Sequence, residues 1–117
     1  MKNFIVVTGG AGFVGTNLIE LILKNTNFKI ISLDNYSSGN RANHIKNNRI
    51  KYISGETLEI SKLLKKFISR IHTVFHFGEF ARIFQSFKNF DECYKSNSIG
   101  SNAVFKFCLD YKIKLIY

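Results

Sequence analysis

The sequence predicts an α/β protein built on a doubly wound parallel sheet. Short apolar runs alternate with amphipathic helical segments along all 117 residues. A glycine-rich turn follows the first apolar run, and an aspartate follows the second. Alternating strands and helices are typical of βαβ units, whose crossovers are right-handed. We therefore expect one domain of about five strands in the order 3-2-1-4-5, with helices on both faces in three α/β/α layers.

The individual elements follow from hydrophobic periodicity and from turn-forming residues. Apolar residues recur at helical spacing after the glycines, and residues 34–47 are polar and predicted to form a loop. Thr57 is expected to cap the second helix, with Glu56 and Glu59 near its positive end. Strands are predicted at residues 4–8, 28–33, 50–53, 73–77 and 113–117, and helices at residues 13–24, 57–69 and from 89 or 91 to 111.

The stretch VVTGGAGFVG indicates a site for phosphate groups. Gly9, Gly12 and Gly15 stand at every third position, and Gly10, Gly12 and Gly15 also satisfy the pattern G-x-G-x-x-G. The first glycine permits a tight turn, the middle one lets the backbone approach a pyrophosphate, and the last lets the helix pack against the strand. The helix that opens near Phe13 directs N–H groups at the phosphates. The alternative is a tight turn without a ligand.

Asp34 indicates that the ligand is a dinucleotide. It lies nineteen residues after Gly15, at the end of the second predicted strand. A carboxylate there accepts hydrogen bonds from the adenosine ribose and repels a 2′-phosphate, which favours NAD over NADP. Arg41 lies close enough in the sequence to weaken that preference. The turn and the aspartate together predict a Rossmann-like cofactor domain.

Composition excludes several classes of protein. Hydrophobic residues make up 45% and charged residues 21% of the chain, as in an ordinary globular domain. No apolar stretch approaches the ~20 residues of a membrane helix or forms a signal peptide, so we expect a cytoplasmic protein without membrane contact. Cys93 and Cys108 are expected on one helix, about 22 Å apart and reduced. Three scattered histidines provide no metal-ligand spacing, so no metal site is predicted.

The positive charge has two interpretations. The net charge is +9, from 17 lysines and arginines against 8 acidic residues. A nucleic-acid partner is one explanation of such a charge. However, the lysines are spread singly, and the densest cluster, Lys62, Lys65 and Lys66, lies on an amphipathic helical segment. We therefore favour a solvated lysine-rich surface and consider nucleic acid an unlikely partner.

Four stretches together resemble the extended short-chain dehydrogenase/reductase family. They are residues 8–15 (TGGAGFVG), 34–40 (DNYSSGN), 74–78 (VFHFG) and 97–101 (NSIGS), with Ser86 following the fourth predicted strand. Within that family the chain is most similar to the NAD-dependent sugar-nucleotide epimerases and dehydratases, in particular to the N-terminal half of the UDP-glucose 4-epimerases. The resemblance covers the whole chain. It implies that residues 1–117 form a dinucleotide-binding domain, that NAD is the cofactor and that a nucleotide-sugar is the family's substrate.

The resemblance also implies roles for individual residues. Backbone amides of Phe13 and Val14 would bind the pyrophosphate that the loop glycines Gly9, Gly12 and Gly15 approach. Asp34 and Asn35 would hold the adenosine ribose, with Ser38 and Gly39 near its phosphate. Glu56 and Thr57 would lie beside the adenine, Phe77, Gly78 and Glu79 would line the nicotinamide ribose, and Asn97 would support the loop after the fourth strand.

Some positions depart from the family pattern. Glu56 replaces a shorter aspartate, and Glu79 stands where the family prefers a small residue. A carboxylate at Glu79 would face the cofactor phosphates unless it turned outward, toward Arg82. Phe90 stands where a proline is usual, and Ser101 replaces a threonine. Glu79 is the departure that weakens the cofactor assignment most.

The residues that perform the family's chemistry are missing. The resemblance implies a Ser or Thr after the fifth strand and a Tyr-x-x-x-Lys on the next helix, where the tyrosine is the general base, followed by a C-terminal substrate domain. The sequence ends at Tyr117, and neither Tyr94 nor Tyr111 has a lysine four positions later. We therefore expect no catalytic residue and no substrate domain in this chain, and an inactive protein when it is alone.

Three functions remain open. The chain is an NAD-binding module derived from a sugar-nucleotide epimerase, a degenerate self-associating remnant with little or no NAD binding, or one half of a split enzyme that needs a complementary catalytic half. Without further strands, the fifth strand forms a sheet edge, and twelve phenylalanines make an exposed apolar patch more probable. A homo-oligomer is therefore expected, formed through the helix at residues 89–111 or through the fifth-strand edge.

Overall fold

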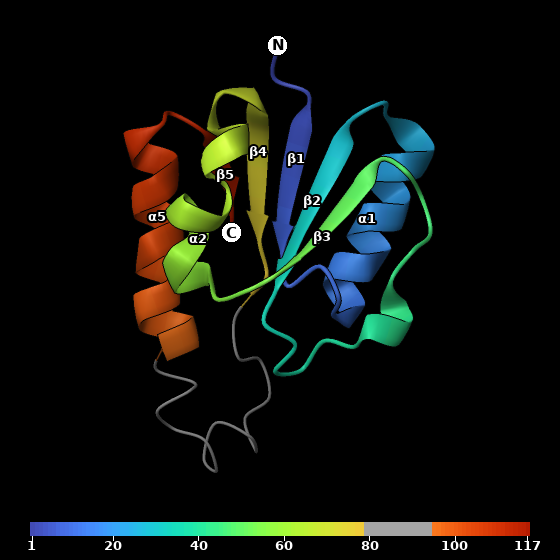
Figure 1. The fold of residues 1–117 in the computed structure, drawn as a ribbon, viewed down its shortest axis with the longest axis horizontal. Coiled ribbons are helices and arrows are strands. Elements are labelled where there is room, and N and C mark those ends of the chain that lie inside the picture. The colour runs from blue at the N-terminus through green and yellow to red at the C-terminus, as the bar shows by residue number, and fades with distance from the viewer. Residues whose placement is uncertain (79–94) are drawn as a thin grey trace.

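Five parallel strands form a single sheet in the order β3-β2-β1-β4-β5 (Figure 1). The computed structural model describes residues 1–78 and 95–117, with the side chains of 95–97 left out. The strands are β1 (Phe4–Thr8), β2 (Lys29–Asp34), β3 (Ile50–Ser54), β4 (Ile71–His76) and β5 (Lys114–Ile116). The helices are α1 (Phe13–Asn25), α2 (Ile60–Leu63) and α5 (Ser101–Asp110). The predicted α/β class and strand order are confirmed.

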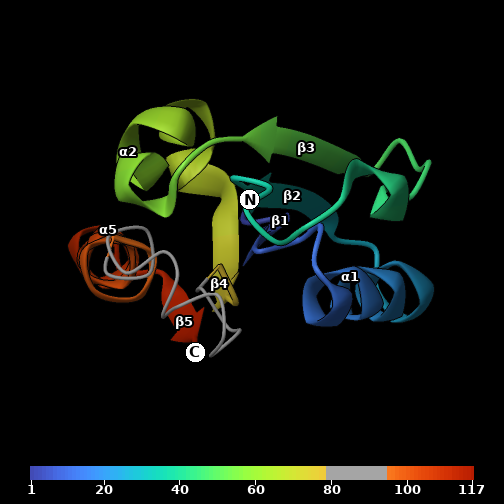
Figure 2. The same cartoon turned by 90° about the horizontal axis from the view of Figure 1, so that it is seen from below.

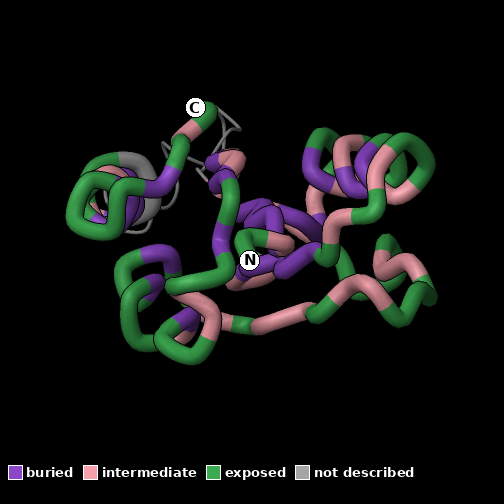
Figure 3. Tube along the Cα trace, turned by 90° about the horizontal axis from the view of Figure 1, so that it is seen from above, coloured by how far each residue is buried: buried purple, intermediate pink, exposed green. Residues whose placement is uncertain are grey.

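Helices cover both faces of the sheet, as the three-layer prediction requires. The α1 helix lies on one face, and α2 and α5 lie on the other (Figures 1 and 2). Successive residues of β1 point to opposite faces. Phe4 and Val6 join the core beneath α2 and α5, whereas Ile5 and Val7 join the core beneath α1. Because both faces of β1 are covered, all of its residues are buried, and each of them before Thr8 is apolar (Figure 3).

The α1 helix begins and ends within a residue of its predicted bounds. Its buried residues Gly15, Ile19 and Ile22 recur at intervals of four and three, so they share the face that packs on the sheet. At its carboxyl end, Thr26 donates a backbone and a side-chain hydrogen bond to the carbonyl of Ile22, at 2.9 and 2.7 Å. Both bonds pair with a carbonyl of the last helical turn, where carbonyls otherwise have only water as a hydrogen-bond partner.

The helix predicted at residues 57–69 is wrong in its continuity and in its cap. The segment is divided into a 3₁₀ turn (Thr57–Glu59), the four-residue α2 and a longer 3₁₀ stretch (Lys65–Arg70). The N-cap position is Glu56, and Thr57 is buried inside the turn instead. The tighter 3₁₀ bonding lets both Leu64 and Phe67 reach the sheet before β4 begins without an intervening loop. Packing against the sheet therefore overrides the amphipathic pattern.

The helix predicted from residue 89 or 91 to 111 is only partly within the described residues. Its described portion is a π-helical turn (Lys95–Gly100) followed by α5. Ser101, Val104 and Cys108 are buried on one face of α5, as the spacing predicted. Cys108 is a free thiol, and burial raises its pKa to about 11. Cys93, Tyr94 and the predicted helix start lie outside the described residues.

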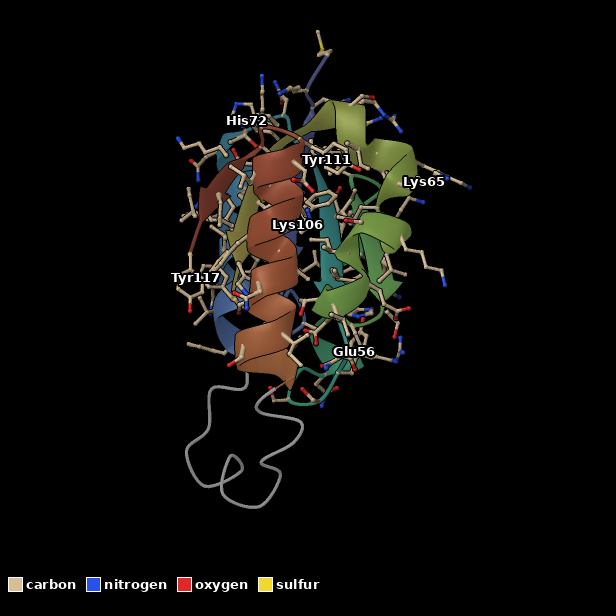
Figure 4. All side chains as sticks on the ribbon, turned by 90° about the vertical axis from the view of Figure 1, so that its left-hand side faces the viewer. Glu56, Lys65, His72, Lys106, Tyr111 and Tyr117 are labelled. Carbon is tan, nitrogen blue, oxygen red and sulfur yellow. The ribbon has the colours of Figure 1, made fainter. Side chains whose placement is uncertain are left out.

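The lysines of the second predicted helix lie on a solvated face. Lys62, Lys65 and Lys66 are all exposed, and Lys65 points away from the sheet (Figure 4). Within residues 1–78 and 95–117, no helix is long and apolar enough to cross a membrane.

Candidate functional site

A cavity of about 470 Å³ lies at the carboxyl ends of β1, β2 and β4. Ligands of open parallel sheets bind at this edge, next to the point where the strand order changes direction. In this sheet that point lies between β1 and β4. The lining residues come from the glycine turn, from the loop after β2, from the segment after β3 and from the end of β4. They are Gly9, Gly12, Phe13, Val14, Gly15, Leu33, Asp34, Asn35, Ser37, Ser38, Gly39, Gly55, Thr57, His76, Phe77, Gly78 and Tyr117.

The glycine turn is held to the sheet by backbone hydrogen bonds. The amide of Gly9 donates to the carbonyl of Leu33 at 2.8 Å, and the amide of Gly12 donates to the carbonyl of Gly9 at 3.1 Å. Gly9 has a φ of +71°, a backbone conformation that residues other than glycine rarely adopt. A Cβ at Gly9 would also lie 2.7 Å from the carbonyl oxygen of Phe77. The first turn and the end of β4 are therefore in direct backbone contact.

The other glycines of the turn differ in what surrounds them. A Cβ at Gly15 would lie 2.2 Å from the carbonyl oxygen of Gly9, and one at Gly10 would lie 2.0 Å from Ser32 Oγ. Gly12 differs, because a Cβ there would meet the Gly9 carbonyl oxygen at an ordinary 3.4 Å. Its φ of −84° and ψ of 179° are also open to any residue. The protein itself therefore does not require a glycine at Gly12, although this residue lines the cavity.

The amino end of α1 opens into the cavity. Gly12 is the N-cap residue and has no side chain to bond the first amides of the helix. Phe13 and Val14 follow and are 82% and 57% exposed, and no acidic residue stands in the first turn. A helix N-terminus with free amides and a positive dipole end attracts an anion.

Asp34 stands at the end of β2 and organises the loops around it. Its Oδ2 accepts the amide of Ala11 at 2.9 Å, and its Oδ1 accepts the amide of Tyr36 at 2.8 Å. Tyr36 has a φ of +62°, and this strained turn is held by the carboxylate. A carboxylate has about four acceptor positions. With one amide on each oxygen, Asp34 retains acceptor capacity on the cavity side, although the residue is 8% exposed.

The loop after β2 forms the side of the cavity at which the sequence predicts the adenosine. Asn35 donates from Nδ2 to Glu56 Oε2 at 3.0 Å. The Tyr36 hydroxyl lies 2.7 Å from His44 Nε2, and the Arg41 guanidinium lies 4.2 Å from the centre of the Tyr36 ring. Burial raises the pKa of Tyr36, and Arg41 opposes that shift. The phenol therefore stays protonated near neutral pH and shares a hydrogen bond with the His44 ring.

The opposite wall of the cavity is the turn after β4. Thr8 Oγ1 accepts the amides of Phe77 and Gly78 at 3.0 and 2.9 Å. The same oxygen lies 2.6 Å from His76 Nδ1, and His76 Nε2 lies 2.9 Å from Ser101 Oγ. One chain of polar contacts thus joins the ends of β1 and β4 to α5.

The structure brings together twelve of the fifteen residues predicted for the site. They are Gly9, Gly12, Phe13, Val14, Gly15, Asp34, Asn35, Ser38, Gly39, Thr57, Phe77 and Gly78. Glu56 does not line the cavity but contacts Asn35, which does. Asn97 belongs to the π-helical turn with its side chain outside the described part, and Glu79, Arg82, Ser86, Asn89, Phe90 and Asp91 lie outside it entirely.

Sequence reasoning missed five residues of the cavity wall. They are Leu33, Ser37, Gly55, His76 and Tyr117. Ser37 and His76 lie inside motifs that were recognised, so adjacency to assigned residues was a usable signal for both. Tyr117 reaches the cavity because β5 pairs beside β4, and no local pattern indicates that. Among the described residues, no group of His, Cys, Asp and Glu could hold a metal ion.

The chain matches the NAD dependent epimerase/dehydratase family over residues 5–117. It is 32% identical to a dTDP-D-glucose 4,6-dehydratase of Dictyostelium discoideum over 94% of this chain and 27% of the relative. It is 31% identical to a UDP-glucose 4-epimerase of Pasteurella multocida over 83% of this chain and 30% of the relative. The chain therefore spans less than a third of the length of these two curated relatives.

A solved structure agrees with the sequence matches. The Bordetella bronchiseptica enzyme WbmG, solved in complex with NAD, superposes with a TM-score of 0.81 and 28% identity, over 96% of this chain and 36% of that one. The resemblance drawn from the glycine turn, Asp34 and the two later motifs is confirmed. This protein belongs to the NAD dependent epimerase/dehydratase family.

Proposed function

We propose that this chain binds NAD in the cavity at the carboxyl ends of β1, β2 and β4. The observation that carries the proposal is Gly12. It lines the cavity at the start of α1, yet neither its backbone angles nor its protein neighbours require a glycine. A close approach of a pyrophosphate to the backbone explains its presence. WbmG, a solved relative, holds NAD, which supports the same ligand here.

The proposed placement follows the chemistry of the two walls. The pyrophosphate would lie over Gly12, with the amides of Phe13 and Val14 directed toward it. The adenosine ribose would donate its hydroxyls to Asp34, with Asn35, Ser38 and Gly39 beside it and Glu56 and Thr57 toward the adenine. The nicotinamide ribose would lie against Phe77 and Gly78, and Glu79 and Asn97 are proposed to complete that end. In this proposal, residues 1–117 act as a cofactor-binding domain.

We propose further that the chain does not catalyse epimerisation alone. NAD supplies a hydride acceptor when bound, but sugar oxidation also needs a base for the hydroxyl proton. Neither Tyr94 nor Tyr111 is followed by a lysine four positions later, and the same holds for Tyr36 and Tyr52. A nucleotide-sugar would then be a ligand only of an assembly that contains a complementary catalytic half. The cytoplasm, as the place where nucleotide-sugars and reduced thiols occur, is the proposed location.

The experiment is calorimetric titration of NAD into the purified chain and two glycine variants. Gly12→Thr keeps a good N-cap residue and places a branched side chain over the phosphates, so its unfolding free energy should change by less than about 1 kcal/mol. Its affinity for NAD should fall at least about a hundredfold, since the backbone can no longer approach the pyrophosphate.

Gly15→Ala is the matched comparison within the same turn. Its Cβ would collide with the Gly9 carbonyl at 2.2 Å, so this variant should lose stability together with binding. A parent chain that shows no heat with NAD at millimolar concentration contradicts the proposal. Equal affinity of the parent and Gly12→Thr would show that NAD binds elsewhere.

Self-association is proposed on a separate observation. In the described part of the chain, β5 is one of the two edge strands, and the large apolar residues near it, Leu109, Tyr111, Ile116 and Tyr117, are 38–79% exposed. An open strand edge beside apolar side chains favours association through β5 or through the helix at residues 89–111. Sedimentation at tens of micromolar should show dimers or larger species, and Ile116→Lys should shift them toward the monomer. A monomeric parent chain would contradict this proposal.

A further inference from the structure

Three polar side chains meet in the core behind the cavity. Thr8 of β1 is 0% exposed, His76 of β4 is 2% exposed and Ser101 of α5 is 3% exposed. Their contacts are 2.6 Å from Thr8 Oγ1 to His76 Nδ1 and 2.9 Å from His76 Nε2 to Ser101 Oγ. Most buried polar groups in a protein core are hydrogen-bonded, so each contact limits where the hydrogens are placed.

Counting donors and acceptors assigns the tautomer of His76. A hydroxyl oxygen has two lone pairs and one hydrogen. Both acceptor positions of Thr8 Oγ1 are taken, by the amides of Phe77 and Gly78. The hydroxyl hydrogen therefore goes to His76 Nδ1, which must be an unprotonated acceptor. The ring hydrogen is then on Nε2 and is donated to Ser101 Oγ, so the network has a single consistent direction from Thr8 to Ser101.

This direction matters because the two amides belong to the cavity wall. Phe77 and Gly78 line the cavity, and the Phe77 carbonyl is the atom against which Gly9 packs. If Nδ1 carried a hydrogen, Thr8 Oγ1 would face three donors with two lone pairs, and one amide bond would be lost. The imidazole thus determines whether the turn after β4 stays in contact with the glycine turn.

We propose that His76, as the neutral tautomer protonated on Nε2, is a positioning residue that fixes the Phe77–Gly78 wall through Thr8. The inference rests on the proposed function for the identity of the ligand, which would be the nicotinamide half of NAD. The aromatic ring of Tyr117 stacks on the imidazole at 5.7 Å and that of Phe105 meets it edge-on at 6.3 Å, so the ring has a defined plane. Ser101 then ties the wall to α5.

Two substitutions of His76 separate positioning from packing. In His76→Asn, Oδ1 takes the place of Nδ1 and accepts the Thr8 hydrogen, but the side chain does not reach Ser101. In His76→Gln, the amide nitrogen takes the place of Nε2 and reaches Ser101, but no acceptor faces Thr8. Glutamine is closer to histidine in volume, so a packing role favours Gln, whereas the proposed role favours Asn.

Thr8 and a second histidine pair provide matched variants. Thr8→Ser keeps the hydroxyl, and Thr8→Val removes it with little change in shape. On β4, the strand of His76, Thr73 is 4% exposed and its Oγ1 lies 2.7 Å from His72 Nδ1. His72 lies at the end of the molecule opposite Glu56 and does not line the cavity (Figure 4). Thr73→Val therefore removes an equivalent hydroxyl away from the proposed wall.

The first measurement uses the unliganded chain and needs no NAD. Nitrogen-15 NMR shifts should show His76 protonated on Nε2 and unprotonated on Nδ1. Hydrogen exchange of the Phe77 and Gly78 amides should accelerate at least about tenfold in His76→Gln and Thr8→Val, as loss of one buried hydrogen bond predicts. It should change less than about threefold in His76→Asn, Thr8→Ser and Thr73→Val. An Nδ1–H tautomer, or faster exchange in Asn than in Gln, overturns the proposal.

The second measurement is titration with NAD and with AMP, which carries only the adenosine half. His76→Gln and Thr8→Val should bind NAD about tenfold more weakly, while binding AMP as the parent does. Equal losses for AMP and NAD would show a general structural effect and contradict the positioning role. A parent chain that does not bind NAD would remove the proposed function, and the tautomer and exchange data would still decide the role of His76.

Discussion

At the scale of single residues, the buried and unpaired hydroxyl of Ser32 is expected to lower the stability of the fold. Ser32 lies in β2 with 1% exposure, and its Oγ has no hydrogen-bond partner among the described residues. It lies beneath the glycine turn, where a Cβ at Gly10 would touch it. A buried hydroxyl without a partner costs about 1–3 kcal/mol. The close approach of the Gly10 backbone leaves no room there for a larger side chain.

Ser32→Ala is therefore expected to stabilise the chain. Removing the hydroxyl should raise the free energy of unfolding by about 1 kcal/mol, measured by urea denaturation at constant m-value. Thr26→Val is the comparison. The Thr26 hydroxyl donates to the Ile22 carbonyl at 2.7 Å, so its removal should lower the free energy of unfolding. If Ser32→Ala is destabilising, then its hydroxyl has a partner in solution, such as an ordered water.

At the scale of elements, Arg49 binds the segment that joins α1 to β2, which lies 21 to 26 residues earlier in the chain. Its Nη2 donates to the Leu23 carbonyl at 2.6 Å, and its Nη1 donates to the carbonyls of Thr26 and Phe28 at 2.7 and 3.2 Å. These carbonyls belong to the last turn of α1 and to the connection into β2. A cation at a helix carboxyl end is favoured by the dipole, and the planar fork of arginine reaches several acceptors.

Substitution of Arg49 should loosen this connection in a graded order. Arg49→Lys keeps the charge but offers one nitrogen, and Arg49→Met keeps only the aliphatic stem. We expect unfolding free energies to fall by about 1 kcal/mol for Lys and about 2–3 kcal/mol for Met, as for hydrogen bonds made by a charged group. Chemical denaturation measures the order, and equal stability of Lys and Met would contradict a directional role for the guanidinium.

At the scale of the whole molecule, ligand binding should stabilise the fold selectively. The proposed site uses the ends of β1, β2 and β4, so NAD would hold both halves of the sheet together. A ligand at a hundredfold excess over its dissociation constant adds about 2.7 kcal/mol to the free energy of unfolding. NAD should therefore raise the melting temperature of this chain.

NADP should raise the melting temperature far less than NAD does. Asp34 is buried beside the proposed ribose position and would repel a 2′-phosphate there, so we expect affinity at least about tenfold weaker for NADP. Arg41 is the group that could oppose this, and it is held 4.2 Å from the Tyr36 ring centre. Thermal shifts measured with both dinucleotides test the preference, and an equal shift would show that Arg41 neutralises the phosphate.

Tertiary packing also explains where the sequence-based predictions failed. Residues 57–69 have the spacing of one helix, but the sheet draws Leu64 and Phe67 inward and divides the segment into shorter turns. The cavity residues were found where a motif was local, as in the glycine turn. Tyr117 was missed because its position depends on the pairing of β5 with β4. Contacts between distant segments have no periodicity to indicate them.

The sequence by itself determined the α/β class, the strand order and most of the cavity wall. Strand and helix periods, a glycine turn and Asp34 are local features, and right-handed crossovers leave few ways to arrange them. Only the tertiary structure decided which glycine is left open toward the cavity and how Thr8, His76 and Ser101 are hydrogen-bonded. Both depend on the distance between backbones that lie up to 93 positions apart, from Thr8 to Ser101. Such distances exist only after the sheet has formed.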